Sequence, residues 1–294
     1  MRRSLYVAVY LILTFCCSCL AGSAWRIEAI ELHPGGERGQ HVVTAIVSSE
    51  VTGDRVKLSA SIPLVRIDEQ FVTGDKLVLI GDADRPQAVA IFDLRTRNLT
   101  DWFVCYAPQR VSEHWLAFVE FYFPHVSGGE PTDVVLIYDL SKSPSENRLE
   151  REPGMKFPPG VLDEAAQHVG TPVYPAWNVE QKSYRNVVAD QTETRGAAMG
   201  MGGFALVGTS KLVFVASEGT FPDKYNYLIA VDLSAGADHP MPRKIDIPKG
   251  RVRKPDRFPN FTTVIRVEAV SPTAVRIYVP ESDYGRGSIV VDIE

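Results

Sequence analysis

The stretch that decides the fold is Phe71–Pro108, FVTGDKLVLIGDADRPQAVAIFDLRTRNLTDWFVCYAP. It contains three runs of apolar and β-branched residues, at 71–80, 87–94 and 102–106, separated by clusters rich in Gly, Asp, Pro or Asn. Short apolar runs bounded by such clusters are typical of strands joined by turns. The sequence therefore predicts an antiparallel meander in this stretch.

Similar runs recur along the chain. Apolar runs that end in aspartate close on Asp93, Asp139, Asp232 and Asp292, and strand-like runs that end in proline close on Pro63, Pro108 and Pro248. A third marker pairs FVTGDKLVLIGD with LVGTSKLVFVASE through Lys76 and Lys211. The three markers agree on a repeat of about 46 residues, a period that indicates radially repeated sheets.

A period in the forties built from short strands is typical of a β-propeller, in which no four-stranded blade buries its faces without neighbours. In period and strand pattern the chain resembles the broad superfamily of WD-repeat-like and other exported bacterial-type propellers. Phe92-Asp93, Tyr138-Asp139 and Val231-Asp232 stand where WD repeats have Trp-Asp. The resemblance implies an all-β propeller fold, and it transfers no functional residue. About 270 residues after the predicted signal peptide, divided by a period of about 46, give six blades, with five or seven as alternatives.

We expect one propeller domain over residues 25–294, with blades at 35–63, 64–108, 109–153, 203–248 and 249–294. Residues 154–202 are irregular and predict either a degenerate blade or a long insertion on a five-bladed ring. The segment at 25–34, WRIEAIELHP, is expected to complete the last blade and close the ring. A competing assignment keeps that segment in the first blade. Helical spacing occurs only at 161–169, where we expect one or two turns.

The N-terminus predicts export. Arg2 and Arg3 precede an apolar segment from Leu5 to Leu20, and small residues follow up to Ala24, the order of a secretory signal peptide. A retained membrane anchor and a lipoprotein are the alternatives. We therefore expect residues 1–24 to be removed and the mature chain, without a transmembrane span, to be secreted or periplasmic.

Charge and cysteine content restrict the classes of function. Removal of residues 1–24, which contain two arginines and no acidic residue, leaves 29 basic and 36 acidic residues. This balance argues against a nucleic-acid partner, because sequence-blind binding needs a basic surface. Cys105 is the one cysteine after residue 24. It lies in an apolar run, so we expect a buried hydrophobic side chain rather than a reactive thiol.

After residue 24 the sequence contains no nucleophile elbow, no phosphate-binding glycine loop, no CxxC pair and no HExxH, and its histidines are not at metal-ligand spacing. The sharper hypothesis concerns the connection between the second and third strand of each blade. Propeller geometry places equivalent connections on one face, which predicts a face rich in carboxylates from Asp82, Asp84, Glu130, Asp133, Glu218, Asp223, Glu281 and Asp283. Such a face would attract calcium, although turn formation alone also enriches loops in these residues.

Further candidates for the same face are basic and aromatic. The loop at 248–260 includes Arg251 and Arg253, and Trp177 and Tyr284 lie in or beside loops. Solvated connections give the same pattern, so these residues are candidates only through their predicted place on the ring.

The sequence favours a non-catalytic, monomeric, exported propeller without a cofactor that binds a protein, peptide or saccharide through one face. The alternative is a divalent-cation-dependent hydrolase or lactonase of the propeller type, a hypothesis that rests on fold analogy. A structural role in an envelope assembly is the third reading.

Overall fold

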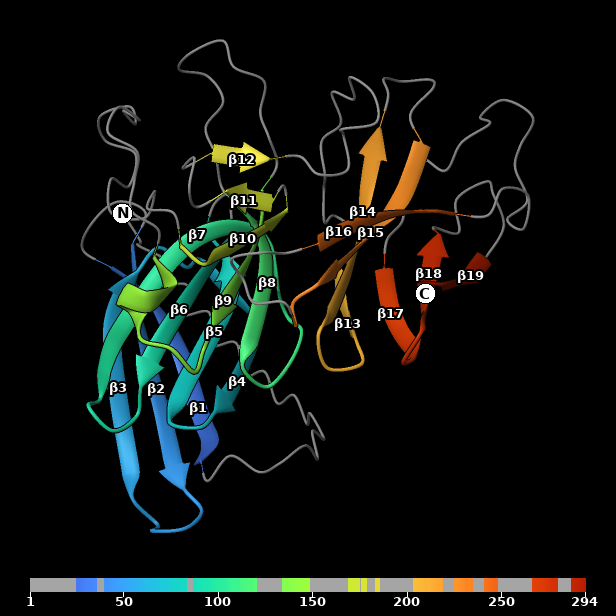
Figure 1. Cartoon of the computed structure of the whole chain (residues 1–294). Helices are drawn as coiled ribbons and strands as arrows, with labels where there is room; N and C mark the ends of the chain where they lie inside the picture. The colour runs from blue at the N-terminus through green and yellow to red at the C-terminus, as the bar shows by residue number, and fades with distance from the viewer. Residues whose placement is uncertain are drawn as a thin grey trace, which may run out of the picture.

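The computed structural model describes residues 25–35, 40–83, 87–120, 134–148, 169–174, 176–178, 183–185, 203–218, 225–234, 241–247, 266–279 and 287–294. These residues form antiparallel sheets that follow one another along the chain (Figure 1). The one helix among them is the 3-10 helix η2, Pro144–Asn147. The predicted all-β fold class is confirmed. The predicted signal peptide and residues 161–168 of the predicted helix lie outside the described residues.

The first sheet has three strands in the order β1 (Trp25–Pro34), β2 (His41–Ser49) and β3 (Arg55–Ile62). β1 pairs with β2 along its length, and Trp25 and Ile27 pack against the core of this sheet. The competing assignment of segment 25–34 to the first sheet is therefore confirmed. The expectation that it completes the last blade is corrected, because the last strand pairs only with the strand before it among the described residues.

The second sheet has seven strands, from β4 to β10 in chain order. They are β4 (Arg66–Thr73), β5 (Lys76–Asp82), β6 (Gln87–Asp93), β7 (Asn98–Arg110), β8 (Trp115–Glu120), β9 (Val135–Asp139) and β10 (Thr171–Tyr174). The predicted single run at 71–80 is two strands. A tight turn divides it at Gly74, which adopts a φ of 53° that favours glycine.

The predicted blade boundary at Pro108 is not a break between sheets. β7 crosses it, pairing with β6 through its first half and with β8 through its second half. The β7–β8 register shifts between Tyr106 and Gln109, where Ala107 has a φ of 48°. This irregularity bends the strand and accommodates Pro108, since proline is tolerated at bulges.

Three further sheets follow. The first is a two-stranded ribbon of β11 (Ala176–Asn178) and β12 (Ser183–Arg185). The second has four strands in the order β13 (Phe204–Val207), β14 (Lys211–Glu218), β15 (Tyr225–Asp232) and β16 (Met241–Asp246). The last has three strands in the order β17 (Arg266–Ser271), β18 (Ala274–Val279) and β19 (Gly287–Asp292). In the irregular segment at 154–202, β10 extends the seven-stranded sheet and β11–β12 stand apart from it.

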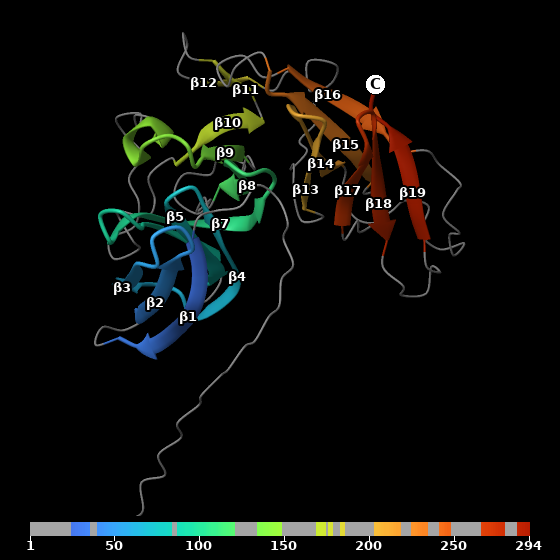
Figure 2. The same cartoon turned by 90° about the horizontal axis from the view of Figure 1, so that it is seen from below.

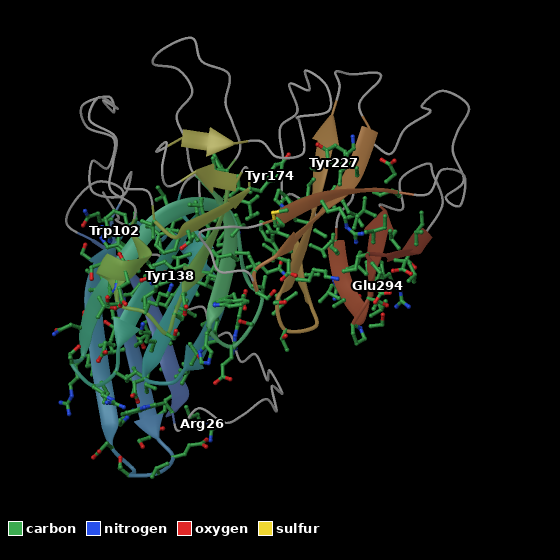
Figure 3. All side chains as sticks on the ribbon, viewed as in Figure 1. Arg26, Trp102, Tyr138, Tyr174, Tyr227 and Glu294 are labelled. Carbon is green, nitrogen blue, oxygen red and sulfur yellow. The ribbon has the colours of Figure 1, made fainter. Side chains whose placement is uncertain are left out.

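Successive sheets pack face to face (Figure 2). One apolar cluster joins β1–β3 to one face of β5–β7, and the second joins the opposite face of these strands to β8 and β9 as the seven-stranded sheet folds back on itself. The third joins β8–β10 to β13–β15, and the fourth joins β13–β15 to β17–β19. Figure 3 shows Tyr174 and Tyr227 at the third of these junctions, where both are buried. No sheet from the irregular segment intervenes between β10 and β13 in this cluster.

The recurring aspartates form the turns that follow β6, β9, β15 and β19. Each carboxylate accepts a backbone N–H from two or three residues further on, namely Thr96 to Asp93 at 2.7 Å, Ser141 to Asp139 at 2.8 Å, Ser234 to Asp232 at 2.9 Å and Glu294 to Asp292 at 2.9 Å. The residue after each aspartate donates its N–H to the hairpin turn before the second strand, as Leu94 does to Asp75 and Ile293 does to Thr273, both at 2.8 Å. The repeat marker is therefore an aspartate turn that is hydrogen-bonded to the preceding hairpin turn.

Polar side chains hold neighbouring sheets together at each junction. The Gln109 side chain donates to Phe204 O and accepts from Phe204 N, both at 2.8 Å, so its amide pairs with the next sheet as a backbone would. Trp25 Nε1 donates to Asp75 Oδ1 at 3.0 Å across the first junction, and Arg243 donates to the carbonyl of Ile293 across the last. These bonds satisfy groups at the borders of the apolar clusters.

Cys105 lies fully buried in the core of the folded-back sheet, and burial raises the pKa of its thiol well above the usual value. The expectation of an unreactive, buried side chain is confirmed. Among the described residues, no helix has the length and apolar character needed to cross a membrane.

We predict that Gly81→Ala disrupts the β4–β5 edge. A Cβ at Gly81 would lie 1.9 Å from the Arg66 carbonyl oxygen, so one strand must move. Overpacking of this kind costs about 1–3 kcal/mol or more. Urea unfolding should show this loss, and Gly53→Ala, which has open space but a φ of 74°, should lose only about 1 kcal/mol. Equal losses in the two variants would contradict the steric explanation.

Candidate functional site

Most of the predicted ligand face lies outside the described residues. This applies to Asp84, Glu130, Asp133, Asp223, Arg251, Arg253, Glu281, Asp283 and Tyr284. Glu218 and Trp177 are described by strand position alone, at the end of β14 and in the middle of β11. Asp82 is the one member with a described side chain, so the grouping of the carboxylates stays a prediction.

Asp82 ends β5 and is partly neutralised there. Arg66 lies on the paired strand β4, with its Nη2 3.8 Å from Asp82 Oδ2 and its Nε 2.6 Å from Asp68 Oδ1. The hydrogen bond with Asp68 raises the pKa of Arg66 above its usual value. Arg66 is therefore shared between Asp68, which it binds more closely, and Asp82, the single described carboxylate of the predicted face.

The ends of equivalent strands lie on a common side in the last two sheets. Figure 1 shows β14 and β18 running in the same direction, so that Glu218 and Val279 end their strands on the same side. Within the described ranges, no group of three or more His, Cys, Asp or Glu side chains is placed to hold a metal ion.

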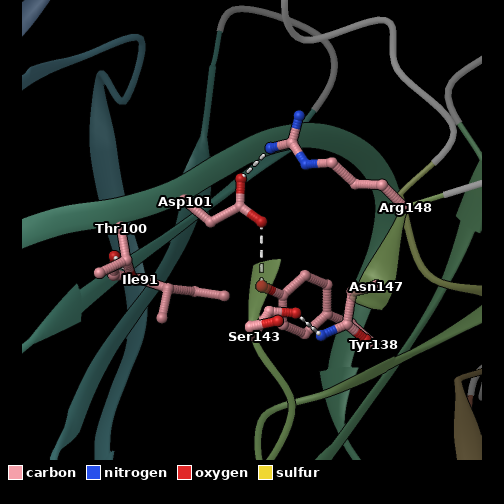
Figure 4. Close-up of polar contacts among 7 residues, drawn as sticks. All are labelled: Ile91, Thr100, Asp101, Tyr138, Ser143, Asn147 and Arg148. Carbon is pink, nitrogen blue, oxygen red and sulfur yellow. Dashed lines mark hydrogen bonds and ion pairs between the residues drawn. The ribbon is translucent and has the colours of Figure 1, made fainter. Parts of the chain in front are cut away.

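A buried polar cluster lies where the seven-stranded sheet folds back (Figure 4). Asp101 on β7 is 4% exposed and accepts the hydroxyl of Tyr138 on β9 at 2.9 Å. Its other carboxylate oxygen forms an ion pair with Arg148, whose side chain is 31% exposed. The cluster connects both halves of the sheet with the segment that carries η2.

Burial dominates the electrostatics of the cluster. It raises the pKa of Asp101 even though Arg148 and the Tyr138 hydroxyl act in the opposite direction. It also raises the pKa of Tyr138 well above its usual value, and the neighbouring Asp101 charge adds to this. The Tyr138 hydroxyl is thus a neutral donor to Asp101 and not a base or a nucleophile near neutral pH.

Lys76 on β5 forms hydrogen bonds to the segment between β9 and η2. Its Nζ donates to the carbonyls of Leu140 and Lys142 at 2.5 and 2.9 Å, and partial burial lowers its pKa. Asn147 supports the segment from inside, because its side chain donates to Asp139 O at 2.9 Å and accepts from Asp139 N at 2.8 Å. The interactions position backbone and leave no reactive group directed to solvent in the cluster.

Sequence reasoning missed this cluster, although a signal was present. Asp101 is an acid inside LTDWFVCY, an otherwise apolar strand pattern, and such an acid needs a buried partner. The partners Tyr138 and Arg148 lie 37 and 47 residues away, close to one repeat, so only the folded-back sheet identifies them.

No protein-family model matches the chain, and no curated protein matches it either. Among solved structures, the chain is similar to the beta-propeller domain of the Trilobed protease from Pyrococcus furiosus, with 11% identity, 91% of this chain and 82% of that chain covered, and a TM-score of 0.32. It is also similar to a prolyl endopeptidase, with 10% identity, 92% of this chain and 34% of that chain covered, and a TM-score of 0.42. The acylaminoacyl peptidase of Pyrococcus horikoshii is similar at 9% identity, with 90% of this chain and 44% of that chain covered and a TM-score of 0.34.

One of these similar structures is a β-propeller domain, the kind of fold that the sequence pattern resembles. The chain spans about a third of the prolyl endopeptidase and less than half of the acylaminoacyl peptidase. Similarity at these TM-scores gives no information on activity, blade number or ring closure.

We predict that Tyr138→Phe destabilises the fold and changes how its stability declines at alkaline pH. Loss of a donor to a buried carboxylate costs about 1.5–3 kcal/mol. The pKa of Tyr138 is higher in the folded state than in the unfolded state. The contribution of its protonated hydroxyl to the free energy of unfolding is therefore complete below the unfolded-state pKa of about 10, and it is lost as the pH rises through the folded-state pKa. Urea unfolding at pH 7 and above pH 10 should show a lower stability for Tyr138→Phe and a shallower alkaline decline.

Tyr278→Phe is the matched control, because its hydroxyl donates to Glu268 at 2.6 Å on the partly exposed face of the last sheet. Its loss should stay below about 1 kcal/mol. A Tyr138→Phe variant no less stable than this control would contradict the role of the buried cluster.

Proposed function

We propose that the protein is an exported, non-catalytic binding module of the β-propeller type, which takes up a protein, peptide or saccharide on one side of its stacked sheets. The observation that supports this proposal is the shared direction of β14 and β18, which brings the ends of equivalent strands to one side (Figure 1). Binding residues concentrate in loops held by a rigid scaffold, and the apolar clusters between the sheets supply that scaffold.

We also infer a finer architecture for this module. The described strands divide into five blade units, β1–β3, β4–β7, β7–β10, β13–β16 and β17–β19, with β7 shared by two of them. This count corresponds to the alternative with five blades and an insertion, rather than to six blades. The repeated aspartate turn in four of these units supports a common orientation of their connections.

A photo-crosslinking amino acid at Glu218 tests the binding side. We expect it to cross-link one discrete partner in the exported fraction of the source cells. The same amino acid at Thr209, an exposed residue in the turn at the opposite end of β14, should not cross-link that partner. Equal products from both positions, or none from Glu218, would argue against binding on this side.

Calcium separates this proposal from a divalent-cation-dependent hydrolase. Calcium at a concentration of 100 times the Kd of its site would stabilise the native state by about 2.7 kcal/mol. For a chain of this size, that stabilisation raises Tm by several degrees. For the binding module we expect saturating calcium to leave Tm unchanged in a thermal melt. A marked increase that a chelator reverses would favour the hydrolase.

A further inference from the structure

The η2 segment, residues 140–148, follows β9 and is attached to the rest of the seven-stranded sheet at both of its ends. At its start, Lys76 Nζ donates to two of its backbone carbonyls. At its end, the Arg148 side chain forms the ion pair with Asp101 on β7. The two attachments differ in kind, because backbone carbonyls do not titrate and a carboxylate does.

The end of the η2 segment also contacts the residues that lead into β10. Arg148 forms a β-bridge with Val169, and Gly170 N donates to the carbonyl of Asn147. Val169 is buried in the apolar cluster of the folded-back sheet. The ion pair of Arg148 with Asp101 therefore connects this end of the segment to the opposite half of the sheet.

Both carboxylate oxygens of Asp101 accept hydrogen bonds, and the two donors respond differently to a proton (Figure 4). Oδ2 accepts the Tyr138 hydroxyl, which can also turn and accept a hydrogen bond. Oδ1 pairs with the Arg148 guanidinium, which has donors only and keeps its charge. A proton on either oxygen removes the negative charge of Asp101, so it weakens the contact with Arg148 in particular.

One other cation lies near Asp101 within the described part of the chain. It is Lys76 on β5, which stays protonated when the pH falls, and β6 places the apolar Ile91 opposite Asp101. The remaining charged groups nearby surround Lys76, and they are Asp93, Asp139 and Glu146. The contact that depends directly on the charge of Asp101 is therefore the one with Arg148.

We propose that the Asp101–Arg148 ion pair is an acid-sensitive switch, in which protonation of Asp101 releases Arg148 and the end of the η2 segment from β7. The start of the segment stays attached through Lys76, and the sheet stays folded. The switch needs no bound partner and is therefore independent of the proposed function.

The direction of the response follows from linkage. Arg148 acts to lower the pKa of Asp101, so a proton bound to Asp101 must in turn weaken the attachment of Arg148. Burial outweighs this effect and raises the pKa of Asp101, which places the release above the pKa of about 3.9 of an aspartate in an unfolded chain. Because its pKa is raised, the folded sheet binds this proton more readily than the unfolded chain does. Acid therefore releases the local contact without destabilising the sheet through Asp101.

Hydrogen exchange of the full chain between about pH 7 and pH 4 tests the switch, with rates expressed as protection factors to remove the intrinsic pH dependence of exchange. The amides of Arg148 and Gly170 report the end of the η2 segment, and the amide of Leu140 reports its start. We expect the first two to lose protection by about tenfold or more on acidification, since hydrogen bonds to charged groups contribute at least that factor. The Leu140 amide should keep its protection.

Asp101→Asn keeps the shape of the side chain and removes its charge. In this variant the amides of Arg148 and Gly170 should have the low protection of the acid form already at neutral pH, and that protection should no longer change with pH. Arg148→Gln alters a partly exposed residue and should give the same result, so it replaces Asp101→Asn if that variant does not fold.

Two matched variants separate the switch from other carboxylates. Glu146 accepts hydrogen bonds from the backbone and the hydroxyl of Ser143. Glu146→Gln keeps a side chain suited to this capping box and should retain the acid response. Glu268→Gln removes the carboxylate from a more exposed cluster of the same side-chain types, with Tyr278 and Arg266, and should also leave the response unchanged.

Four results would overturn the proposal. These are a protection of Gly170 that does not change with pH, an acid response that persists in Asp101→Asn or Arg148→Gln, its disappearance in Glu146→Gln, and an equal loss of protection at Leu140 and Gly170. The last result would indicate that acid opens the whole sheet and not the end of the η2 segment.

Discussion

The structure depends on the burial of both faces of its inner sheets. A single sheet of this size exposes its apolar faces, and face-to-face packing on both sides removes them from water. β5 and β6 show the consequence in sequence, because LVLI at 77–80 and AVAIF at 88–92 are buried at every position of these runs. Removal of one large buried residue from such a contact costs about 2–5 kcal/mol, which is a large part of a domain's total stability.

Apolar contact alone does not fix how one sheet lies on the next, since the hydrophobic effect has no direction. The polar side chains at the junctions supply that direction. Gln109 pairs with both backbone groups of Phe204, so sliding of the two sheets would break two hydrogen bonds at once. Asp101, Tyr138 and Arg148 act similarly where the seven-stranded sheet folds back, and breaking a buried ion pair costs more than its formation contributes.

The repeat could be predicted from the sequence because its marker has a local cause. The aspartate turns at Asp93, Asp139, Asp232 and Asp292 use bonds over two or three residues, which leave the same trace in every copy. The sharing of β7 by two units could not be predicted, because the bend depends on the positive φ of Ala107, a residue with no preference for it. Pro108 was therefore interpreted as the end of a strand.

The candidate site was less accessible to sequence reasoning for a related reason. Asp101 meets Tyr138 and Arg148 through the folding back of the sheet, and no local pattern encodes that contact. The carboxylate face rested on loops whose members lie mostly outside the described residues, and Asp82 proved to have Arg66 as a counter-ion. Patterns within a strand or a turn were predictable here, and contacts between units were not.

The two terminal sheets differ from the inner ones in a way that bears on closure. β3 and β19 alternate between buried and exposed residues, so each terminal sheet has one apolar face and one face with polar side chains such as Lys57 and Ser288. Direct packing of the first sheet on the last would take Lys57 and the ion pair of Arg266 with Glu268 out of water, which is costly. The polar outer faces are instead compatible with water, as in the capping units of other repeat proteins.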